Sequence, residues 1–420
     1  MANLTGIIKP SLHLNPFTTE LEQRLAEIRE QGLYRELRRV DSAQSPHVQI
    51  NGKNFLNFSS NDYLGLANHP QLKEAATKAV ERFGAGSGAS RLICGSLAPH
   101  HELEAALADF KQTESALSFS SGYAAAVGSI CALAGKDDII ILDKLVHACI
   151  VDAARLSGAK LRIFAHNGLT ELEDILRWAS QRPAASPDAR HPRALIITES
   201  VFSMDGDFAP LREIVALKNK YGAWLMVDEA HATGLYGKNR RGLAEEFSVS
   251  DQIEIHMGTL GKALGSSGGY ICGPRVLIDY LINRARTFIF STAPVPASAA
   301  AAQAAIKLVQ SPEGESRLNQ LWSLVHQTKT NLTQAGWPAT AARSAIIPLH
   351  IGPEAQAVET AATLRELGLY IPAIRYPTVA RGQSRLRLTL TAAHTTNDLT
   401  NLTTALHSAL RTPHSTLPHA

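Results

Sequence analysis

The sequence predicts an α/β protein with a large, mostly parallel sheet covered by helices, followed by a smaller α+β part. Between residues 117 and 227, apolar runs of strand length alternate with amphipathic segments of helix length. Strands separated by helices form parallel sheets covered on both faces. After residue 296 the pattern changes to Ala- and Leu-rich helical segments with a few strands. We therefore expect an N-terminal helix and hairpin (1–60), a large domain (61–295), a C-terminal domain (296–411) and a disordered tail (412–420).

The composition excludes several classes of protein. The chain has 420 residues, 45% of them hydrophobic and 19% charged, as in ordinary globular proteins. Its net charge of +3 gives no electrostatic basis for binding nucleic acid. The four cysteines contain no C-x-x-C pair, so neither a zinc framework nor any other metal site is indicated, and a reducing compartment fits. The most apolar run, 124–135, is too short to cross a bilayer. We expect a cytoplasmic protein without membrane or nucleic-acid partners.

The N-terminal segment has two predicted elements. Residues 18–39 carry Leu21, Leu25, Ile28 and Leu37 at helical spacing, and Arg35, Arg38 and Arg39 would end this helix. Residues 48–50 and 54–58 flank Asn51-Gly52, which predicts a β-hairpin with a type I′ turn.

The remaining elements follow from periodicity and from turn residues. In the large domain we predict helices over 71–83, 100–111, 124–133, 169–179 and 211–221, and strands over 117–119, 138–142, 161–164, 194–198, 224–227, 253–255 and 270–272. In the C-terminal domain we predict helices over 297–310, 315–335, 354–367 and 397–410, and strands over 346–351, 370–374 and 386–390.

Polar residues follow the ends of several predicted strands, where open α/β sheets bind ligands. These residues are His147, Ser203, Asp228 with His231, and Thr259 with Lys262. Lys262 lies in a Gly- and Ser-rich loop between two predicted strands. Desolvation there would lower the pKa of its amine and make it a nucleophile suited to forming a Schiff base.

Each of these residues alone is compatible with a structural role, such as a helix cap, a turn or a core histidine. Together they fit pyridoxal phosphate. Its aldehyde needs a lysine amine, its pyridine nitrogen needs a carboxylate, and its ring can stack on an imidazole. The small residues 120–123, before the helix at 124–133, would supply backbone N–H groups for its phosphate.

Three other short motifs match known signatures but lack the context that those signatures require. Gly84, Gly86 and Ala89 fit a dinucleotide fingerprint, but a helix precedes them where a strand is required. Asp228-Glu229-Ala230-His231 spells a helicase Walker-B box, yet the chain has no phosphate-binding P-loop. Gly265-Ser266-Ser267-Gly268-Gly269 matches the nucleophile elbow of serine hydrolases, with His394 as a possible partner, but this leaves Lys262 and Asp228 unexplained.

Longer motifs carry a resemblance to a known family. They span nearly the whole chain, from about residue 35 to 400: Ser59-Ser60-Asn61-Asp62-Tyr63-Leu64-Gly65, Thr198-Glu199-Ser200-Val201-Phe202-Ser203-Met204-Asp205-Gly206-Asp207, Asp228-Glu229-Ala230-His231, Thr259-Leu260-Gly261-Lys262 and Arg385-Leu386-Arg387-Leu388. With these motifs the chain resembles the α-oxoamine synthase family of fold-type I pyridoxal-phosphate enzymes.

The resemblance implies roles around the cofactor. Lys262 would form the Schiff base and later move the Cα proton, Asp228 would pair with the pyridinium nitrogen, and His147 would stack on the ring. His231 and Ser203 would approach the phenolic oxygen. The backbone of Gly122 and Tyr123, together with Thr259, would hold the cofactor. Thr292 would reach the phosphate of a partner subunit, so the resemblance also implies a homodimer.

The resemblance further implies a decarboxylative condensation of an amino acid with an acyl thioester. Asn61 and Arg387 would hold the amino-acid carboxylate, and Arg35 and Thr378 would contact the acyl group. His147 and Arg375 would also be substrate-binding residues. Residues 373–379, which include Arg375, and residues 385–394 favour the branch of the family in the biotin pathway. The substrates would then be L-alanine and pimeloyl-CoA or its carrier-protein equivalent. A sister enzyme that uses glycine and acetyl-CoA is the alternative.

Overall fold

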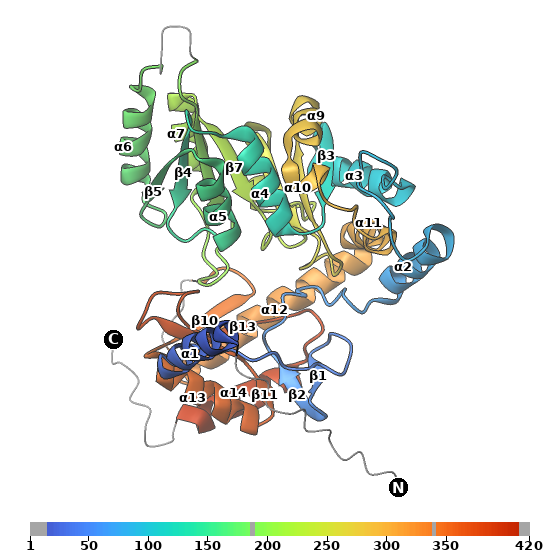
Figure 1. Cartoon of the computed structure of the whole chain (residues 1–420). Coiled ribbons are helices and arrows are strands. Elements are labelled where there is room, and N and C mark those ends of the chain that lie inside the picture. Colours follow the sequence, from blue (N-terminus) through green and yellow to red (C-terminus); the bar gives the residue numbers. More distant parts are fainter. Residues whose placement is uncertain (1–14, 185–189, 338–341, 411–420) are drawn as a thin grey trace.

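The computed structural model describes residues 15–184, 190–337 and 342–410 (Figure 1). The predicted tail lies outside these residues. The strands of the large part are β3 (Ser115–Phe119), β4 (Ile139–Asp143), β5 (Lys160–Phe164), β6 (Ala194–Glu199), β7 (Trp224–Asp228), β8 (Ile255–Thr259) and β9 (Gly269–Gly273). Its helices are α2 (Pro70–Phe83), α3 (Ala98–Lys111), α4 (Gly122–Leu133), α5 (Ala148–Ser157), α6 (Leu169–Ser180), α7 (Leu211–Tyr221), α8 (Leu243–Glu246), α9 (Arg275–Arg284) and α10 (Arg286–Ile289), with a 3₁₀ turn at Ser250–Gln252.

The seven strands form one mixed sheet in the order β3-β9-β8-β7-β6-β4-β5. The pairs from β8 to β5 are parallel, and β9 runs antiparallel to both of its neighbours. Helices cover both faces of the sheet. Successive residues of a strand point to opposite faces, so alternate residues pack against different helices. Ile140 and Leu142 pack with α4, α5, α9 and α10, whereas Ile139 and Ile141 pack with α6 and α7. The predicted α/β architecture is therefore confirmed.

The parallel register brings the ends of the central strands together. Glu199, the last residue of β6, pairs with Asp228, the last residue of β7, and Asp228 pairs in turn with Met257 of β8. Neighbouring strands lie about 4.8 Å apart. The two carboxylates therefore lie side by side at the carboxyl edge of the sheet, close to the loop that carries Lys262.

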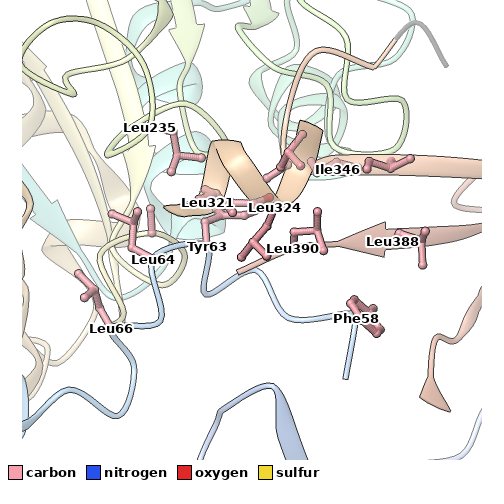
Figure 2. Packing of buried hydrophobic residues seen from close by; sticks show 14 of the residues in the cluster. Phe58, Tyr63, Leu64, Leu66, Leu235, Leu321, Leu324, Ile346, Leu388 and Leu390 are labelled. Atoms are coloured by element: carbon pink, nitrogen blue, oxygen red, sulfur yellow. The ribbon is translucent and has the colours of Figure 1, made fainter. Parts of the chain in front are cut away.

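The C-terminal part contains α11 (Pro296–Gln310), α12 (Pro312–Gln334), α13 (Glu354–Glu366) and α14 (Thr396–Leu410), with strands β10 (Ile346–Gly352), β11 (Leu369–Tyr370), β12 (Ala373–Ile374) and β13 (Ser384–Thr389). β10, β13 and β12 form an antiparallel sheet. A buried cluster joins this part to the rest of the chain (Figure 2): Leu321 and Leu324 of α12 and Leu388 of β13 pack with Tyr63 and Leu235. α11 also packs against α2 and α3. The domain boundaries stay a prediction.

The N-terminal segment contains α1 (Pro16–Glu30), β1 (His47–Ile50) and β2 (Lys53–Asn57). The predicted hairpin is confirmed, since β1 and β2 pair antiparallel and both turn residues, Asn51 and Gly52, have positive φ. The predicted end of the first helix is wrong. α1 stops at Glu30 because Gly32 adopts a left-handed φ of 66°. Arg35, Arg38 and Arg39 therefore lie beyond the helix and cap nothing.

Two further expectations are corrected, and one helix is added. The strand before Lys262 is Ile255–Thr259 and not 253–255, because a strand buried on both faces shows no apolar–polar alternation. The strand predicted over 370–374 is two short strands, since Leu369–Tyr370 pairs with β2 and Ala373–Ile374 pairs with β13. Helix α5, directly after His147, was not predicted. No helix among the described residues is long and apolar enough to cross a membrane.

Candidate active site

Lys262 lies in the loop between β8 and β9, as expected. Backbone hydrogen bonds from Leu260 N to Gly268 O and from Gly265 N to Lys262 O, both 2.9 Å, close this loop. The Nζ atom of Lys262 lies 2.7 Å from Nε2 of His231. On the other side of that ring, Nδ1 lies 2.5 Å from the hydroxyl of Tyr63. The structure thus brings Lys262 and His231 together and adds Tyr63, which was not predicted as a site residue.

The surroundings of Lys262 make its amine available at neutral pH. Burial lowers its pKa to about 8, although the nearby carboxyl groups of Asp228 and Glu199 oppose this change. Burial also lowers the pKa of His231 well below the usual value, so that its ring is neutral. A neutral imidazole beside an amine can accept a proton from it or donate one to it.

Two buried carboxyl groups face this amine. Asp228 is 5% exposed and its Oδ1 accepts the backbone N–H of Ala230 at 2.9 Å. Burial raises the pKa of Asp228. Burial, together with the neighbouring charge of Asp228, raises the pKa of Glu199 to about 8. Glu199 Oε1 has no hydrogen-bond partner among the described residues. Sequence reasoning missed Glu199 as a site residue, although it ends a strand next to the one that ends in Asp228.

His147 caps the N-terminus of α5, and its Nδ1 accepts the backbone N–H of Cys149 at 3.2 Å. The thiol of Cys149 lies 3.0 Å from the same nitrogen. Nδ1 is therefore an acceptor, which makes Nε2 the protonated nitrogen of the neutral ring. Burial lowers the pKa of His147, and the charges of Asp228 and Lys262 both act on it. His147 thus belongs to the same group as Lys262 and Asp228.

Asn61, Ser203 and Arg387 meet beside this group. Arg387 Nη1 donates to Asn61 Oδ1 at 3.1 Å, and its Nε donates to the Ser203 carbonyl at 2.5 Å. The Arg387 charge also acts on Lys262 and His231. A guanidinium next to an amide and close to the lysine amine is suited to binding a carboxylate.

The N-terminus of α4 approaches the same loop. Ser121 is the N-cap of α4, and Gly122 and Tyr123 open the helix, where N–H groups have no acceptor inside the helix. A methyl group at Gly122 would lie 3.8 Å from the Cβ of Thr259. The Thr259 hydroxyl donates to the Gly268 carbonyl at 2.9 Å. The Tyr123 hydroxyl donates to Asp152, so this residue offers its backbone to the site.

Arg35, Arg375 and Thr378 line a second pocket of about 500 Å³. Arg375 donates to the carbonyls of Gly32 (2.5 Å) and Tyr34 (2.6 Å), and Arg35 donates to the Tyr376 carbonyl at 3.3 Å. Burial lowers the pKa of Arg375, and the nearby Arg35 charge adds to this. Arg375 therefore fixes the segment on which the exposed Arg35 stands. Thr292 is exposed and bridges to Ser90, away from this pocket.

The structure disfavours the competing motifs. His394 stacks on Phe58 in the core, and its Nε2 lies 3.1 Å from the Asn57 carbonyl, so it is not available to Ser267. Glu229 of the Walker-B-like box forms a buried ion pair with Lys111 at 2.7 Å. The glycines at 84–88 follow α2, and no strand precedes them there.

The residues of the site fit pyridoxal phosphate. A lysine amine of lowered pKa, a buried carboxylate at the next strand end, an imidazole and a helix N-terminus converge at one edge of the sheet. Among the described residues, Glu199 Oε1 has no hydrogen-bond partner, and Asp228 accepts a backbone N–H but no bond from a charged donor. A buried carboxylate needs such a partner, and a protonated ring nitrogen of the cofactor would supply it.

Comparisons with known proteins agree with this site. The sequence model of the family described as "Aminotransferase class I and II" matches residues 53–406. An 8-amino-7-oxononanoate synthase from Geobacter sulfurreducens is 47% identical over 389 residues, which cover 93% of this chain and 97% of that protein. A serine palmitoyltransferase from S. paucimobilis with a bound PLP–myriocin aldimine has a TM-score of 0.86 at 30% identity and covers 94% of this chain and 98% of its own. The structure of an 8-amino-7-oxononanoate synthase from Francisella tularensis has a TM-score of 0.71 at 28% identity and covers 84% of this chain and 97% of its own.

The chain belongs to the aminotransferase class I and II family and, within it, to the 8-amino-7-oxononanoate synthases. The resemblance to α-oxoamine synthases and the expected fold type are thereby confirmed.

Proposed function

We propose that this protein is a pyridoxal-phosphate-dependent acyltransferase that condenses L-alanine with a pimeloyl thioester and releases the thiol (CoA or the carrier protein) and CO2. The product would be 8-amino-7-oxononanoate, and the protein would act in biotin biosynthesis. The observation that carries the proposal is Lys262, whose amine has a pKa of about 8 and lies 2.7 Å from His231 beside Asp228. The 47% identity to an 8-amino-7-oxononanoate synthase over 93% of the chain supports the choice of substrates.

Pyridoxal phosphate, when bound, supplies an aldehyde for the lysine amine and a ring that withdraws electrons from the carbon next to the amino group. Asp228 would hold a proton on the ring nitrogen, because a carboxylate at close range favours the cation. His147 would cover one face of the ring. The N–H groups of Gly122 and Tyr123 would bind the phosphate at the N-terminus of α4, with Thr259 beside them.

Lys262 would carry the Cα proton of alanine during the reaction. Its pKa of about 8 leaves part of the amine neutral at neutral pH, as a general base requires. His231 lies 2.7 Å away and its ring is neutral, so it would orient the amine without placing a positive charge beside it. Ser203 would lie with His231 on the phenolic oxygen side.

Arg387 and Asn61 would bind the alanine carboxylate. Their mutual hydrogen bond of 3.1 Å fixes both side chains close to the lysine. Arg35 and Thr378, held in place by Arg375, would bind the far carboxylate of the pimeloyl chain in the second pocket. An enzyme that uses glycine and acetyl-CoA needs no such cation, because acetyl-CoA has no second carboxylate on its acyl group. We therefore propose a pimeloyl thioester and not acetyl-CoA as the acyl substrate.

We also propose a homodimer. Phe17, Leu21, Leu25 and Ile28 form an apolar stripe on α1, and all four are exposed. Phe290, two residues before Thr292, is 71% exposed. Large apolar groups that cluster on a surface favour burial against another protein. In the dimer, Thr292 would contact the cofactor phosphate of the other subunit.

The test is a substrate matrix. CoA release by the protein loaded with pyridoxal phosphate is measured with L-alanine, glycine or L-serine against pimeloyl-, acetyl- and palmitoyl-CoA, and with pimeloyl carrier protein. We expect the highest kcat/KM for L-alanine with a pimeloyl thioester. A preference for glycine with acetyl-CoA, or for serine with palmitoyl-CoA, would assign the chain to a sister enzyme.

A further inference from the structure

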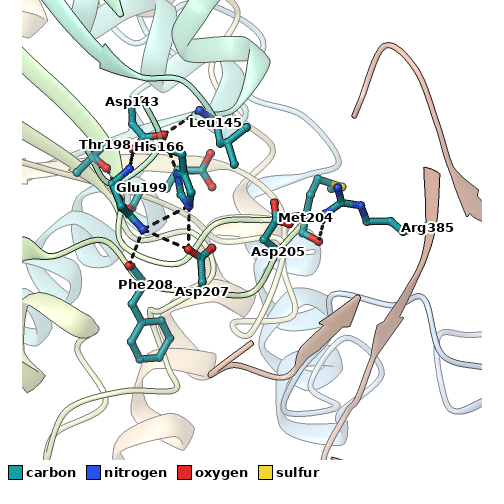
Figure 3. A network of polar contacts seen from close by, with 11 residues as sticks. Asp143, Leu145, His166, Thr198, Glu199, Met204, Asp205, Asp207, Phe208 and Arg385 are labelled. Atoms are coloured by element: carbon teal, nitrogen blue, oxygen red, sulfur yellow. Dashed lines mark hydrogen bonds and ion pairs between the residues drawn. The ribbon is translucent and has the colours of Figure 1, made fainter. Parts of the chain in front are cut away.

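His166 bridges two carboxylates at the carboxyl edge of the sheet (Figure 3). Its Nδ1 lies 3.0 Å from Asp143 Oδ1, and its Nε2 lies 2.8 Å from Asp207 Oδ2. Asp143 ends β4, and Asp207 closes the turn after β6. Sequence reasoning did not single out His166, and none of the roles proposed above uses it.

The bridging ring carries a proton on both nitrogens. Asn167 Nδ2 lies 3.3 Å from His166 Nε2, but its two hydrogens are used by Asp207 Oδ2 (3.2 Å) and the Phe208 carbonyl (3.1 Å). Each ring nitrogen therefore faces a carboxylate oxygen that can only accept. Burial alone would lower the pKa of His166, but the hydrogen bonds and charges of Asp143 and Asp207 raise it to about 10. His166 is an imidazolium at neutral pH.

One end of this bridge fixes the segment that leads to His147. Asp143 Oδ1 also accepts the backbone N–H of Leu145 at 2.8 Å, and Asp143 Oδ2 accepts that of Asn167 at 2.8 Å. Residues 143–147 thus leave β4 in one conformation, and His147 then caps α5. Moving Asp143 would move the starting point of the His147 loop.

The other end fixes the turn that carries Ser203. The Phe202 N–H donates to the Asp207 carbonyl at 3.0 Å, and Gly206 N–H donates to the Phe202 carbonyl at 2.9 Å. The Phe202 ring meets the His166 ring edge to face, with centroids 4.3 Å apart. From the opposite side, Arg385 forms an ion pair with Asp205, and Arg387 binds the Ser203 carbonyl. The turn is therefore held between His166 and the C-terminal sheet.

We propose that His166 is a positioning residue that, as an imidazolium, sets the spacing between the His147 loop and the Ser203 turn. The inference rests on the proposed function for the roles of His147 and Ser203 at the cofactor. It deepens that function, because the cofactor ring would lie between these two segments and would sense any change in their separation. No group of His166 needs to touch the substrate or the cofactor.

The first experiment replaces His166 with Gln, which cannot bridge two carboxylates as a donor at both ends. The control is His326→Gln on the exposed face of α12. We expect kcat to fall about 10²-fold, as for a displacement of about 1 Å at a reacting centre. The visible absorption band of the bound cofactor should shift, and its dissociation constant from the apoprotein should rise. Loss of stability alone would move the unfolding temperature and leave the absorption band unchanged.

The second experiment tests the bridge itself. Asp207→Asn keeps the imidazole and the volume of the site, which guards against a His166→Gln protein that fails to fold. If His166 and Asp207 act through one bridge, their effects are coupled and are not additive. The cofactor dissociation constant of the double variant should then rise no more than about 3-fold beyond that of either single variant. An unchanged absorption band and cofactor affinity in Asp207→Asn, or losses that multiply in the double variant, would overturn the proposal. The absorption band and the cofactor dissociation constant need no acyl substrate, so these two readouts stand apart from the substrate matrix that tests the proposed function.

Discussion

The amine of Lys262 lies 2.7 Å from Nε2 of His231, a buried imidazole that the Tyr63 hydroxyl contacts on its other nitrogen. The three groups form a line from the predicted Schiff-base lysine to the hydrophobic core, where Tyr63 is 1% exposed. Because His231 is neutral, the line contains no fixed positive charge beside the amine. The protonation of Lys262 therefore depends mainly on burial and on the two carboxyl groups that face it.

The first prediction concerns the pKa of Lys262. In the apoprotein, a reagent that reacts with neutral amines should label Lys262 faster as the pH rises, with a midpoint near pH 8. Asp228→Asn should move this midpoint to lower pH, because the Asp228 carboxylate raises the pKa of the amine; an opposite charge at close range is worth about one to three pKa units. Peptide mapping by mass spectrometry identifies the labelled lysine. A midpoint near 10.5 in the wild type would show that burial does not lower the pKa of Lys262.

The second prediction concerns Glu199. Its pKa is raised to about 8 in the folded protein, against 4.5 for an ordinary glutamate. The folded state thus retains a proton that the unfolded state releases, and stability falls as the pH rises from 4.5 through 8. Glu199→Gln should flatten this fall in the apoprotein, so that the variant gains stability relative to the wild type at pH 9 but not at pH 4. Urea unfolding at both pH values measures the difference, and Glu20→Gln on the exposed face of α1 is the control.

The third prediction separates the two substrate anions. Arg387→Ala should raise KM for L-alanine, and Arg35→Ala should raise KM for the pimeloyl thioester while leaving that for alanine almost unchanged. A hydrogen bond to a charged group contributes about 1.5–3 kcal/mol, so each KM should rise by about one to two powers of ten. Arg39→Ala, which removes an exposed ion pair with Asp41, is the matched control for Arg35. If Arg35→Ala changes only the KM for alanine, the second pocket is not the acyl site.

The fourth prediction concerns Tyr63. Tyr63→Phe leaves Nδ1 of the buried His231 without its partner at 2.5 Å. Leaving one buried polar group unpaired costs about 1–3 kcal/mol of unfolding free energy. Tyr280→Phe removes a 3.2 Å hydrogen bond from an exposed hydroxyl to the Ala132 carbonyl and should cost much less. The unfolding free energy of both variants is measured by urea unfolding of the apoprotein. Equal losses would show that the Tyr63–His231 contact stabilises the fold no more than an exposed hydrogen bond does.

The sequence was sufficient for features that depend on local patterns. The alternation of strands and helices predicted the large sheet, and Asn51-Gly52 predicted the separate N-terminal hairpin because both turn residues must adopt positive φ. The motifs around Lys262 and Asp228 predicted the cofactor, which the family confirms. Local periodicity failed where burial removed it, as in the strand Ile255–Thr259, and where Gly32 ended a helix whose apolar spacing continued to Leu37.

The sequence by itself determined which chemical groups this protein can use: an amine, carboxylates, imidazoles and guanidinium groups, each placed at the end of a strand or in a loop. Only the tertiary structure decided which of them meet. Glu199 became a site residue because parallel register sets it beside Asp228, and His166 became a bridge because Asp143 and Asp207 approach it from two different strand ends. Such contacts join residues far apart in the chain. Their distances, and the pKa shifts that follow from burial, arise only when the sheet has formed.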